Sequence, residues 1–505
     1  MKHYDAVVIG AGNGGIGTAL ALTTAGVKTL VLEKHNLPGG CATSFVRGRF
    51  EYDASLHAMF YDLLFKNVWE NQFHITSPVT RVPDIITVAY TDTDGKNVYM
   101  DLPLGARELV MAIEKEIPGS APVVQQYLGL CGEVLGAAKF AKSPDFTPEL
   151  MQEKFPHFQM LMKMTAQEVF DYLEMPMNIQ AIFNNLWWYL GPKIDEFPFF
   201  RYAPVVMMLV TMPTYFPNHA CHGYLAEMET KIRENGGDVW LNTEVTEIVT
   251  KDGKVCGVKT NHGDYIETTQ VIADVSPRIV FEDLIKEDSP KKQALLERQK
   301  DITENFSFTI VYLGLNKSAE ELGIKAHHLF IADAADAKET YEASRGWEGP
   351  YCIGALCPNV TVKDFSPEGT CVLSLSVPML GSALDGMTQE EYFKAKDEFA
   401  QKIIKTTGEH LGIDLFDCIE EISIATPATL SRYAGVRNGA LGYARTFADI
   451  RKNEAATAQL NGGNPEEVYE GLSFVGQFAF GIGYQTNVTG IPVAMKVAQT
   501  IKGGN

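Results

Sequence analysis

The sequence lacks the motifs of several common enzyme classes. It contains no G-x-S-x-G stretch of the serine hydrolase type and no G-x-x-x-x-G-K-[ST] phosphate-binding loop. Its eight cysteines form no C-x-x-C pair, which removes the usual signature of a dithiol redox site or a paired zinc motif. No internal repeat and no low-complexity tract are present. The sequence therefore gives no support for a serine hydrolase, a P-loop nucleotidase or a repeat scaffold.

Basic residues are also scarce. The chain has 43 Lys and Arg against 63 Asp and Glu, which gives a formal net charge of −20. Such a surface repels phosphate backbones, so we expect no nucleic-acid partner. The same charge disfavours broad attachment to anionic lipid. Peripheral membrane contact and homo-oligomer formation remain open.

Long hydrophobic runs are missing as well. The longest, residues 202–216, contains prolines and is too short to cross a bilayer. The scattered cysteines indicate free thiols in a reducing compartment. The sequence begins almost directly on a strand pattern, which leaves no room for a signal peptide. We therefore expect a cytoplasmic protein, and its 505 residues imply two or three domains.

What the sequence does contain is a glycine-rich turn between a strand and a helix. Residues 4–9 form a short β-branched run, and Gly10, Gly12 and Gly15 follow in G-x-G-x-x-G spacing. The first glycine permits a tight turn, the second lets the backbone approach a diphosphate, and the third lets helix and strand pack closely. The helix is rich in small residues and is expected to end at Gly26.

An acidic residue completes this pattern. A second β-branched strand ends in Glu33, about 20 residues beyond the glycines, where a carboxylate normally binds the ribose hydroxyls of a dinucleotide. The amino end of the intervening helix would present amide donors to the phosphates. Strand, glycines, helix, strand and acid occur in order. The sequence therefore predicts a dinucleotide site.

A second glycine pair indicates which dinucleotide is bound. Gly39 and Gly40 follow Glu33 and Lys34 by a few residues and precede Cys41. In NAD enzymes this region usually leads directly into the next helix. A Gly-Gly turn here instead favours a cofactor whose second half folds back past the first unit, as in FAD.

The segments GAGNGGIGTA, VLEK, PGGCATSF and FEYDASLH resemble the opening of phytoene desaturase-related flavoproteins, especially their carotenoid isomerase and retinol saturase branch. Two departures stand out. Ala54 and Ser55 occupy the place of an aliphatic residue and a glycine, and Cys41 stands where desaturases and amine oxidases usually carry arginine. The resemblance implies an α/β chain, with a Rossmann-like FAD-binding domain of the glutathione-reductase type and a discontinuous α+β substrate domain. The implied FAD-binding domain comprises residues 1–65, 221–289 and 441–505, and the substrate domain comprises residues 66–220 and 290–440.

Two later blocks extend the resemblance. Residues 223–237 form an amphipathic helix with Leu225, Met228 and Ile232 on one face, and strand patterns follow to residue 277. The resemblance implies that the backbone at Val245 reaches the adenine. Near the C-terminus, Gln477 follows Gly476 where relatives have an acid on the ribityl chain. The expected cofactor-binding residues are thus Gly10, Gly12, Gly15, Glu33, Lys34, Gly39, Gly40, Cys41, Val245, Gly476, Gln477 and Asn487.

Three residues are candidates for proton transfer beside the flavin: His57, His222 and Tyr484. Each has an ordinary structural alternative, as a solvated histidine or a pocket wall. His219, Cys221 and His222 also suggest zinc, but no further ligands occur nearby at the usual spacing, so no metal site is predicted. Arg201 lies beside an aromatic run, where it could anchor a substrate carboxylate or form part of the surface.

The middle of the chain is apolar in pieces, which fits either core helices or a pocket for a long apolar substrate: residues 158–164, 183–191 and 197–210. We expect an FAD-dependent oxidoreductase or redox-neutral isomerase that acts on C=C bonds of a polyene. The resemblance implies a carotenoid-, retinoid- or fatty-acid-like substrate. Two alternatives remain: a flavin amine or amino-acid oxidase, and a flavin-holding carrier of lipophilic molecules without turnover.

Overall fold

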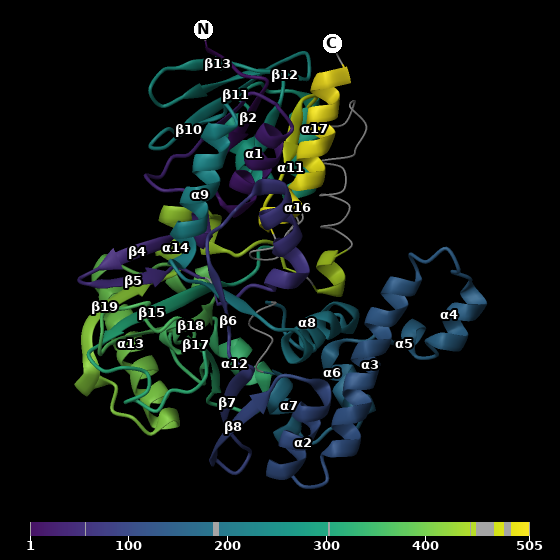
Figure 1. Cartoon of the computed structure of the whole chain (residues 1–505), viewed down its shortest axis with the longest axis vertical. Coiled ribbons are helices and arrows are strands. Elements are labelled where there is room, and N and C mark those ends of the chain that lie inside the picture. The colour runs from purple at the N-terminus through teal and green to yellow at the C-terminus, as the bar shows by residue number, and fades with distance from the viewer. Residues whose placement is uncertain are drawn as a thin grey trace.

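A computed structural model describes residues 2–55, 57–184, 191–300, 303–444, 446–450, 469–478 and 486–503. Figure 1 shows three regions: a parallel sheet with its helices at the upper end, a larger mixed sheet at the lower left, and a group of helices at the lower right. The first strand and the last helix both lie at the upper end (Figure 1).

The parallel sheet contains five strands in the order β10-β3-β2-β14-β20. The strands are β2 (Ala6–Ile9), β3 (Thr29–Leu32), β10 (Asp238–Trp240), β14 (Val271–Ala273) and β20 (Leu472–Phe474). In β2, Ala6 and Val8 pack into one hydrophobic cluster while Val7 and Ile9 pack into another on the opposite face. Both faces are therefore covered, which explains the continuous apolar runs in the sequence.

Three helices cover one face of this sheet: α1 (Asn13–Thr24), α9 (Ala220–Glu234) and α17 (Ile491–Gly503). Leu225, Met228 and Ile232 of α9 are fully buried, so the predicted face is confirmed. Gly26, with φ of +79°, follows α1 as expected. Helix α9 starts three residues before the predicted helix.

A four-stranded sheet in the order β1-β13-β12-β11 packs on the other face. Its strands are β1 (Lys2–His3), β11 (Val245–Lys251), β12 (Lys254–Thr260) and β13 (Tyr265–Glu267). The turn between β11 and β12 contains Asp252 and Gly253, both at positive φ. This is the strand, turn and strand order that residues 238–277 predict.

The larger sheet has seven strands in the order β19-β15-β18-β17-β16-β7-β8. They are β7 (Ile85–Thr91), β8 (Asn97–Pro103), β15 (Ser307–Leu315), β16 (His328–Ala332), β17 (Cys352–Leu356), β18 (Cys371–Met379) and β19 (Ile419–Ala425). The neighbours β16 and β7 run parallel although more than 200 residues separate them, whereas the other pairs are antiparallel.

Two further elements flank this sheet. Helix α13 (Gln389–Leu411) packs against the sheet through Phe399, Ile403 and Ile404. The hairpin β4 (Ser44–Arg47) and β5 (Phe50–Asp53) lies between the two sheets, where Tyr52 packs on Tyr312 of β15.

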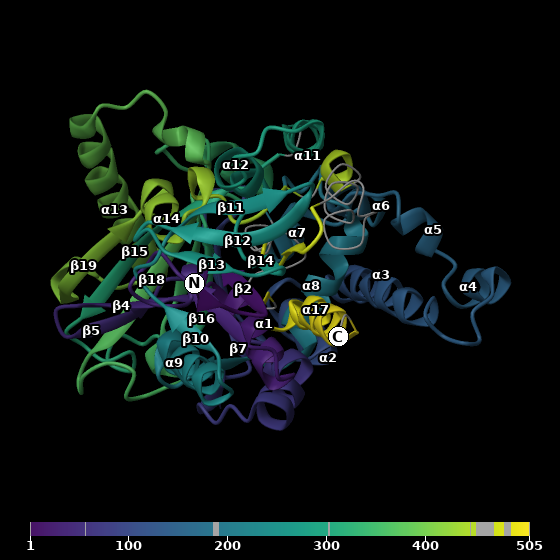
Figure 2. The same ribbon diagram turned by 90° about the horizontal axis from the view of Figure 1, so that it is seen from above.

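The helical region extends from α2 to α8. Its helices are α2 (Ala106–Glu116), α3 (Ala121–Phe140), α4 (Pro148–Lys154), α5 (Phe158–Leu161), α6 (Ala166–Tyr172), α7 (Met177–Asn184) and α8 (Phe199–Thr211). Figure 2 shows α4 and α5 projecting from the rest of the molecule, while α8 lies inward. Among the helices that the structure describes, none is long and apolar enough to cross a membrane.

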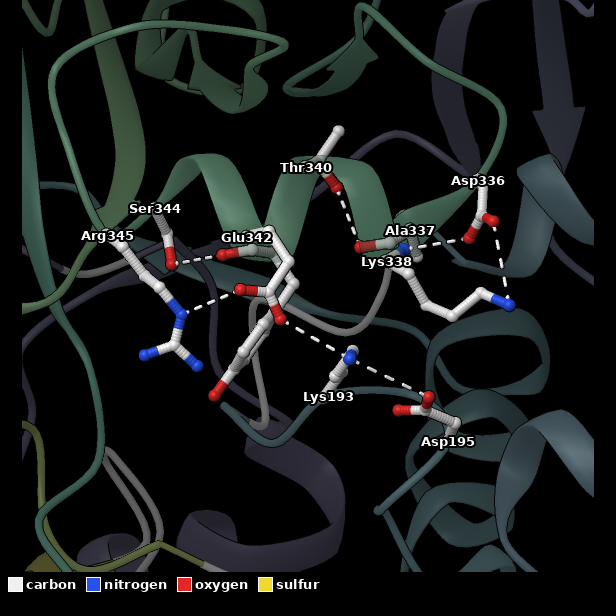
Figure 3. Close-up of polar contacts among 10 residues, drawn as sticks. Lys193, Asp195, Asp336, Ala337, Lys338, Thr340, Glu342, Ser344 and Arg345 are labelled. Carbon is white, nitrogen blue, oxygen red and sulfur yellow. Dashed lines mark hydrogen bonds and ion pairs between the residues drawn. The ribbon is translucent and has the colours of Figure 1, made fainter.

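An ion-pair network attaches helix α12 (Ala337–Ala343) to the segment that precedes α8 (Figure 3). Glu342 accepts from Lys193 at 3.3 Å and from Arg345 at 2.7 Å, and Lys193 also lies 3.8 Å from Asp195. Asp336 caps the helix by accepting a hydrogen bond from the Lys338 amide. The network thus connects the helical region to the seven-stranded sheet. The expected domain boundaries stay a prediction.

Candidate functional site

A cavity of about 480 Å³ opens at the carboxyl ends of β2 and β3. This is the edge of a parallel α/β sheet at which ligands bind in such folds. One end of the cavity is lined by the predicted glycine turn, including Gly10, Gly12 and Gly14. The volume lies within the range of small-molecule and cofactor sites.

The backbone of the turn has the conformation that the glycine spacing predicts. Gly10 has φ of +93° and donates its N–H to the Leu32 carbonyl at 2.8 Å. A Cβ atom at Gly15 would lie 2.1 Å from the Gly10 carbonyl oxygen, so any side chain there would separate α1 from β2. Gly15 itself does not line the cavity; it acts through this close approach. The turn therefore places the backbone of Gly12 and Gly14 on the cavity wall at the amino end of α1, where a diphosphate would bind.

Glu33 is buried at the end of β3 and lines the same cavity. One carboxylate oxygen accepts from the Ala11 amide at 2.6 Å and the other from the His35 amide at 2.8 Å. These bonds hold the side chain in place. Because each carboxylate oxygen can accept two hydrogen bonds, the group retains capacity for ribose hydroxyls. Lys34 lines the cavity beside Glu33.

The second glycine pair lies against the first. Gly39 and Gly40 have φ of +120° and +60°, and the Gly39 N–H donates to the Ala11 carbonyl at 2.7 Å. Both line the cavity together with Cys41. Burial, with the nearby Asp274, raises the pKa of Cys41 to about 11, so its thiol stays protonated at neutral pH. Cys41 is thus a neutral wall residue.

Asp274 is a cavity residue that the sequence interpretation missed. It follows β14 directly, and its carboxylate accepts from the Gly15 amide at 2.7 Å. Burial raises its pKa to about 7, with a further contribution from Glu33, while the Gly15 hydrogen bond opposes the shift. An acid directly after a buried parallel strand, at the sheet edge where ligands bind, is the signal that could have found it.

The other end of the cavity is apolar. Helix α8 contributes Val205, Met208 and Leu209, and the residues around β15 contribute Phe306, Phe308, Ile310 and Leu441. Of the three apolar segments noted in the sequence, residues 197–210 thus supply cavity wall. Residues 158–164 do not line the cavity, and Leu161 lies in the core. Residues 185–190 fall outside the described part of the chain.

His57 lines the cavity as part of a group of three histidines. Its backbone carbonyl accepts a hydrogen bond from His327 Nε2 at 2.9 Å, which leaves His327 Nδ1 to accept from the Thr361 hydroxyl at 2.8 Å. The ring of His328 lies nearly parallel to that of His57, with 6.2 Å between ring centroids. Neither His327 nor His328 was predicted from the sequence.

All three rings are neutral at neutral pH. Burial, together with His327, lowers the pKa of His57 to about 3. Burial lowers the pKa of His327 to about 4, against the opposing effect of its bond to His57. The pKa of His328 is lowered well below its usual value by burial and by both neighbours. The group can therefore hydrogen-bond, but it holds no imidazolium with which to donate a proton.

The structure does not bring every candidate to the cavity. His222 is half-exposed, with its Nδ1 2.5 Å from Glu51, and it does not line the cavity. Asn487 is buried beside α1, where it donates to the Asn13 side chain at 3.1 Å and accepts from the Trp69 indole at 2.9 Å. These contacts hold Asn13, the first residue of α1, from a position outside the cavity. Tyr484 lies outside the described residues.

Val245 and Gln477 do line the cavity, and Gly476 packs against Asp274 behind it. A Cβ atom at Gly476 would lie 1.9 Å from the Asp274 carboxylate. Arg201, the candidate substrate anchor, is not a cavity residue and lies near Phe200. Within the described ranges, no group of three or more His, Cys, Asp or Glu side chains is arranged to hold a metal ion.

Comparison with known proteins agrees with this geometry. A family model described as an NAD(P)-binding Rossmann-like domain matches residues 8–70. Prolycopene isomerase of Daucus carota is 22% identical over 87% of this chain and 72% of that protein. All-trans-retinol 13,14-reductase of Danio rerio is 23% identical over 68% of this chain, and the match spans 59% of that protein's length.

Among solved structures, a variant of putrescine oxidase superposes with a TM-score of 0.67 over the full length of both chains, at 13% identity. The likeness confirms the predicted fold class, a Rossmann-like α/β domain combined with further sheets and helices. The sequence relatives confirm the resemblance to the carotenoid isomerase and retinol saturase branch, and both are enzymes.

Proposed function

We propose that this protein is an FAD-dependent oxidoreductase or redox-neutral isomerase that acts on C=C bonds of an apolar polyene. The observation that carries the proposal is one continuous cavity with a dinucleotide-type glycine cradle at one end and an apolar wall at the other. The sequence relatives support it, because they are named as an isomerase of prolycopene and a reductase of retinol.

The residues at the cradle fit a dinucleotide. Gly10, Gly12 and Gly14 expose backbone at the amino end of α1, where an anion is stabilised by amide donors and by the helix dipole. Glu33 would bind the adenosine ribose, and Val245 would lie by the adenine. Gln477 would reach the ribityl chain. When bound, a flavin supplies hydride transfer at its ring.

The protonation state of Asp274 affects whether a diphosphate can bind at the glycine turn. Its carboxylate lies beside Gly12 and Gly14, where a diphosphate would bring two further negative charges. The raised pKa allows Asp274 to be protonated near neutral pH, and a protonated acid can donate a hydrogen bond to a phosphate oxygen. We therefore expect dinucleotide binding to favour the protonated form of Asp274.

The apolar end determines what else the cavity accepts. Its wall of Met208, Leu209, Phe306 and Phe308 offers no charged partner for an ammonium group, which an amine oxidase substrate would carry. At 13% identity, the likeness to putrescine oxidase concerns the fold alone. A polyene can instead bury apolar surface against such a wall.

The neutral histidines restrict the proton chemistry. His57 would act as a weak acceptor or a hydrogen-bonding group, because a pKa of about 3 leaves no imidazolium to donate.

The test is anaerobic mixing of the reduced, flavin-loaded protein with a conjugated polyene, followed by mass analysis of the product. The proposal predicts either a product of equal mass with a shifted or isomerised double bond, or a product two hydrogens heavier together with reoxidation of the flavin absorbance. A carrier without turnover would return the polyene unchanged. A protein that stays colourless after incubation with FAD would contradict the proposal.

A further inference from the structure

His328 occupies an unusual place on an otherwise apolar sheet face. Side chains two residues apart in a strand share a face, so His328, Phe330 and Ala332 of β16 point to the same side. Phe330 and Ala332 lie in the large hydrophobic cluster that also contains Tyr202 and Phe308. His328 is 6% exposed and is the polar member at the end of this apolar row.

The same residue separates two cavities. Besides the main cavity, His328 lines a second cavity of about 50 Å³ between β7, β8, β16 and helices α2, α7 and α8. Leu209 and Thr214 also line both cavities. Most of the second cavity's wall is aliphatic or aromatic, including Val88, Leu102 and Phe330. An apolar chain that reaches the wall shared by the two cavities would therefore contact His328.

The two ring nitrogens of His328 are not equivalent. Nδ1 is enclosed, and within the part of the chain that the structure describes it has no hydrogen-bond partner. An enclosed N–H without an acceptor is rarer in folded proteins than an enclosed acceptor without a donor. This favours the tautomer with its proton on Nε2. The ring thus offers one neutral N–H donor, and its neighbours His57 and His327 disfavour any added positive charge.

A neutral donor on an otherwise apolar cavity wall recognises an oxygen acceptor. It has no charge with which to attract a carboxylate strongly, whereas a hydroxyl or carbonyl oxygen can accept its N–H without bringing a buried charge. A pure hydrocarbon would leave this donor unsatisfied, which costs binding free energy.

We propose that His328 makes this site selective for apolar chains that carry one hydroxyl or carbonyl oxygen, bound at the wall that the main cavity shares with the second cavity. This inference rests on the proposed function, because it places a polyene-like chain in the main cavity. It goes beyond that function by naming the polar group that the substrate carries and the residue that binds it.

The experiment compares two matched probes on the flavin-loaded full chain: the C20 polyene alcohol retinol, and the same polyene ending in a methyl group. Dissociation constants are measured by quenching of protein fluorescence. The wild type is expected to bind the alcohol about tenfold more tightly than the hydrocarbon. His328→Phe, which keeps a flat ring beside Phe330, should bind the two probes equally. His328→Gln, which keeps an N–H donor, should restore part of the preference.

The matched control is His3→Phe, the same substitution at an exposed position on β1, which should keep the wild-type preference. Equal affinity of the wild type for both probes would overturn the inference, and turnover of the hydrocarbon would then still uphold the proposed function. A preference that survives in His328→Phe would also overturn it. If neither probe binds the flavin-loaded protein, the proposed function fails together with the inference.

Discussion

Replacing Gly15 with alanine tests the glycine cradle directly. The added Cβ would lie 2.1 Å from the Gly10 carbonyl oxygen, against an ordinary contact distance of at least 3.4 Å. The Cβ is attached directly to the backbone of α1, and the carbonyl belongs to Gly10, which directly follows β2, so neither atom can rotate away. The amino end of α1 must therefore move away from β2 by about 1 Å.

The shift has two separable consequences. Forcing a methyl group into a closely packed contact typically lowers the free energy of unfolding by about 1–3 kcal/mol. The amide groups that would bind the diphosphate move with the helix, so we expect flavin affinity to fall about tenfold or more. Affinity is measured by titrating the apoprotein with FAD and following flavin fluorescence, and stability by urea unfolding without flavin.

The control is Gly129→Ala in α3. Gly129 is an exposed helical glycine with nothing within 4 Å of the added Cβ. That substitution should stabilise the protein by about 0.4–1 kcal/mol and leave flavin affinity unchanged. If Gly15→Ala binds FAD as tightly as the wild type does, the reasoning from the cradle is wrong.

Three further predictions follow from the same contacts. Folding raises the pKa of Asp274 from 3.8 to about 7, so the free energy of unfolding falls as pH rises from about 4 to 7 and stays at the lower value above pH 7. Asp274→Asn should therefore raise the free energy of unfolding at pH 8 by up to about 4 kcal/mol, with no gain below pH 4, as urea unfolding at each pH would check. The same variant should lose any decline in FAD affinity above pH 7, which FAD titration across pH would measure. Asn487→Leu should lower the free energy of unfolding by about 1–3 kcal/mol, because it removes the acceptor of the buried Trp69 indole N–H and one of the bonds to the Asn13 side chain; unchanged urea unfolding would contradict this. Lys193→Ala should change the free energy of unfolding by less than about 1 kcal/mol, because the ion pairs in Figure 3 are solvent-exposed at Glu342 and Arg345. A larger fall in the free energy of unfolding, measured by thermal unfolding, would contradict this.

Local patterns predicted the dinucleotide-type unit well. Strand β2, the glycine turn and Glu33 depend on neighbours within one βαβ unit, so their arrangement is encoded in adjacent residues. The buried face of α9 follows from helical spacing alone. The relatives confirm the expected enzyme class, and the structural neighbours confirm the expected fold class.

Which strands pair in the seven-stranded sheet could not be predicted from local patterns. Strand β16 pairs with β7, more than 200 residues away, and no local pattern specifies that partner. Consequently nothing in the sequence indicated that His327 and His328 would meet His57. Asn487 was expected on the cofactor from the resemblance, but the direction of its side chain is set by the contact with α1. The cytoplasmic location stays a prediction, and the sequence made no prediction of peripheral membrane contact or oligomeric state.

If one cavity holds a flavin against the glycine turn and a polyene against the apolar wall, a crystal structure of the protein grown with FAD should show the flavin in that cavity. We expect diphosphate density at Gly10, Gly12 and Gly14, and the isoalloxazine ring between that turn and the wall that includes Met208 and Phe306. A crevice filled by protein side chains, or a dinucleotide bound elsewhere, would contradict it.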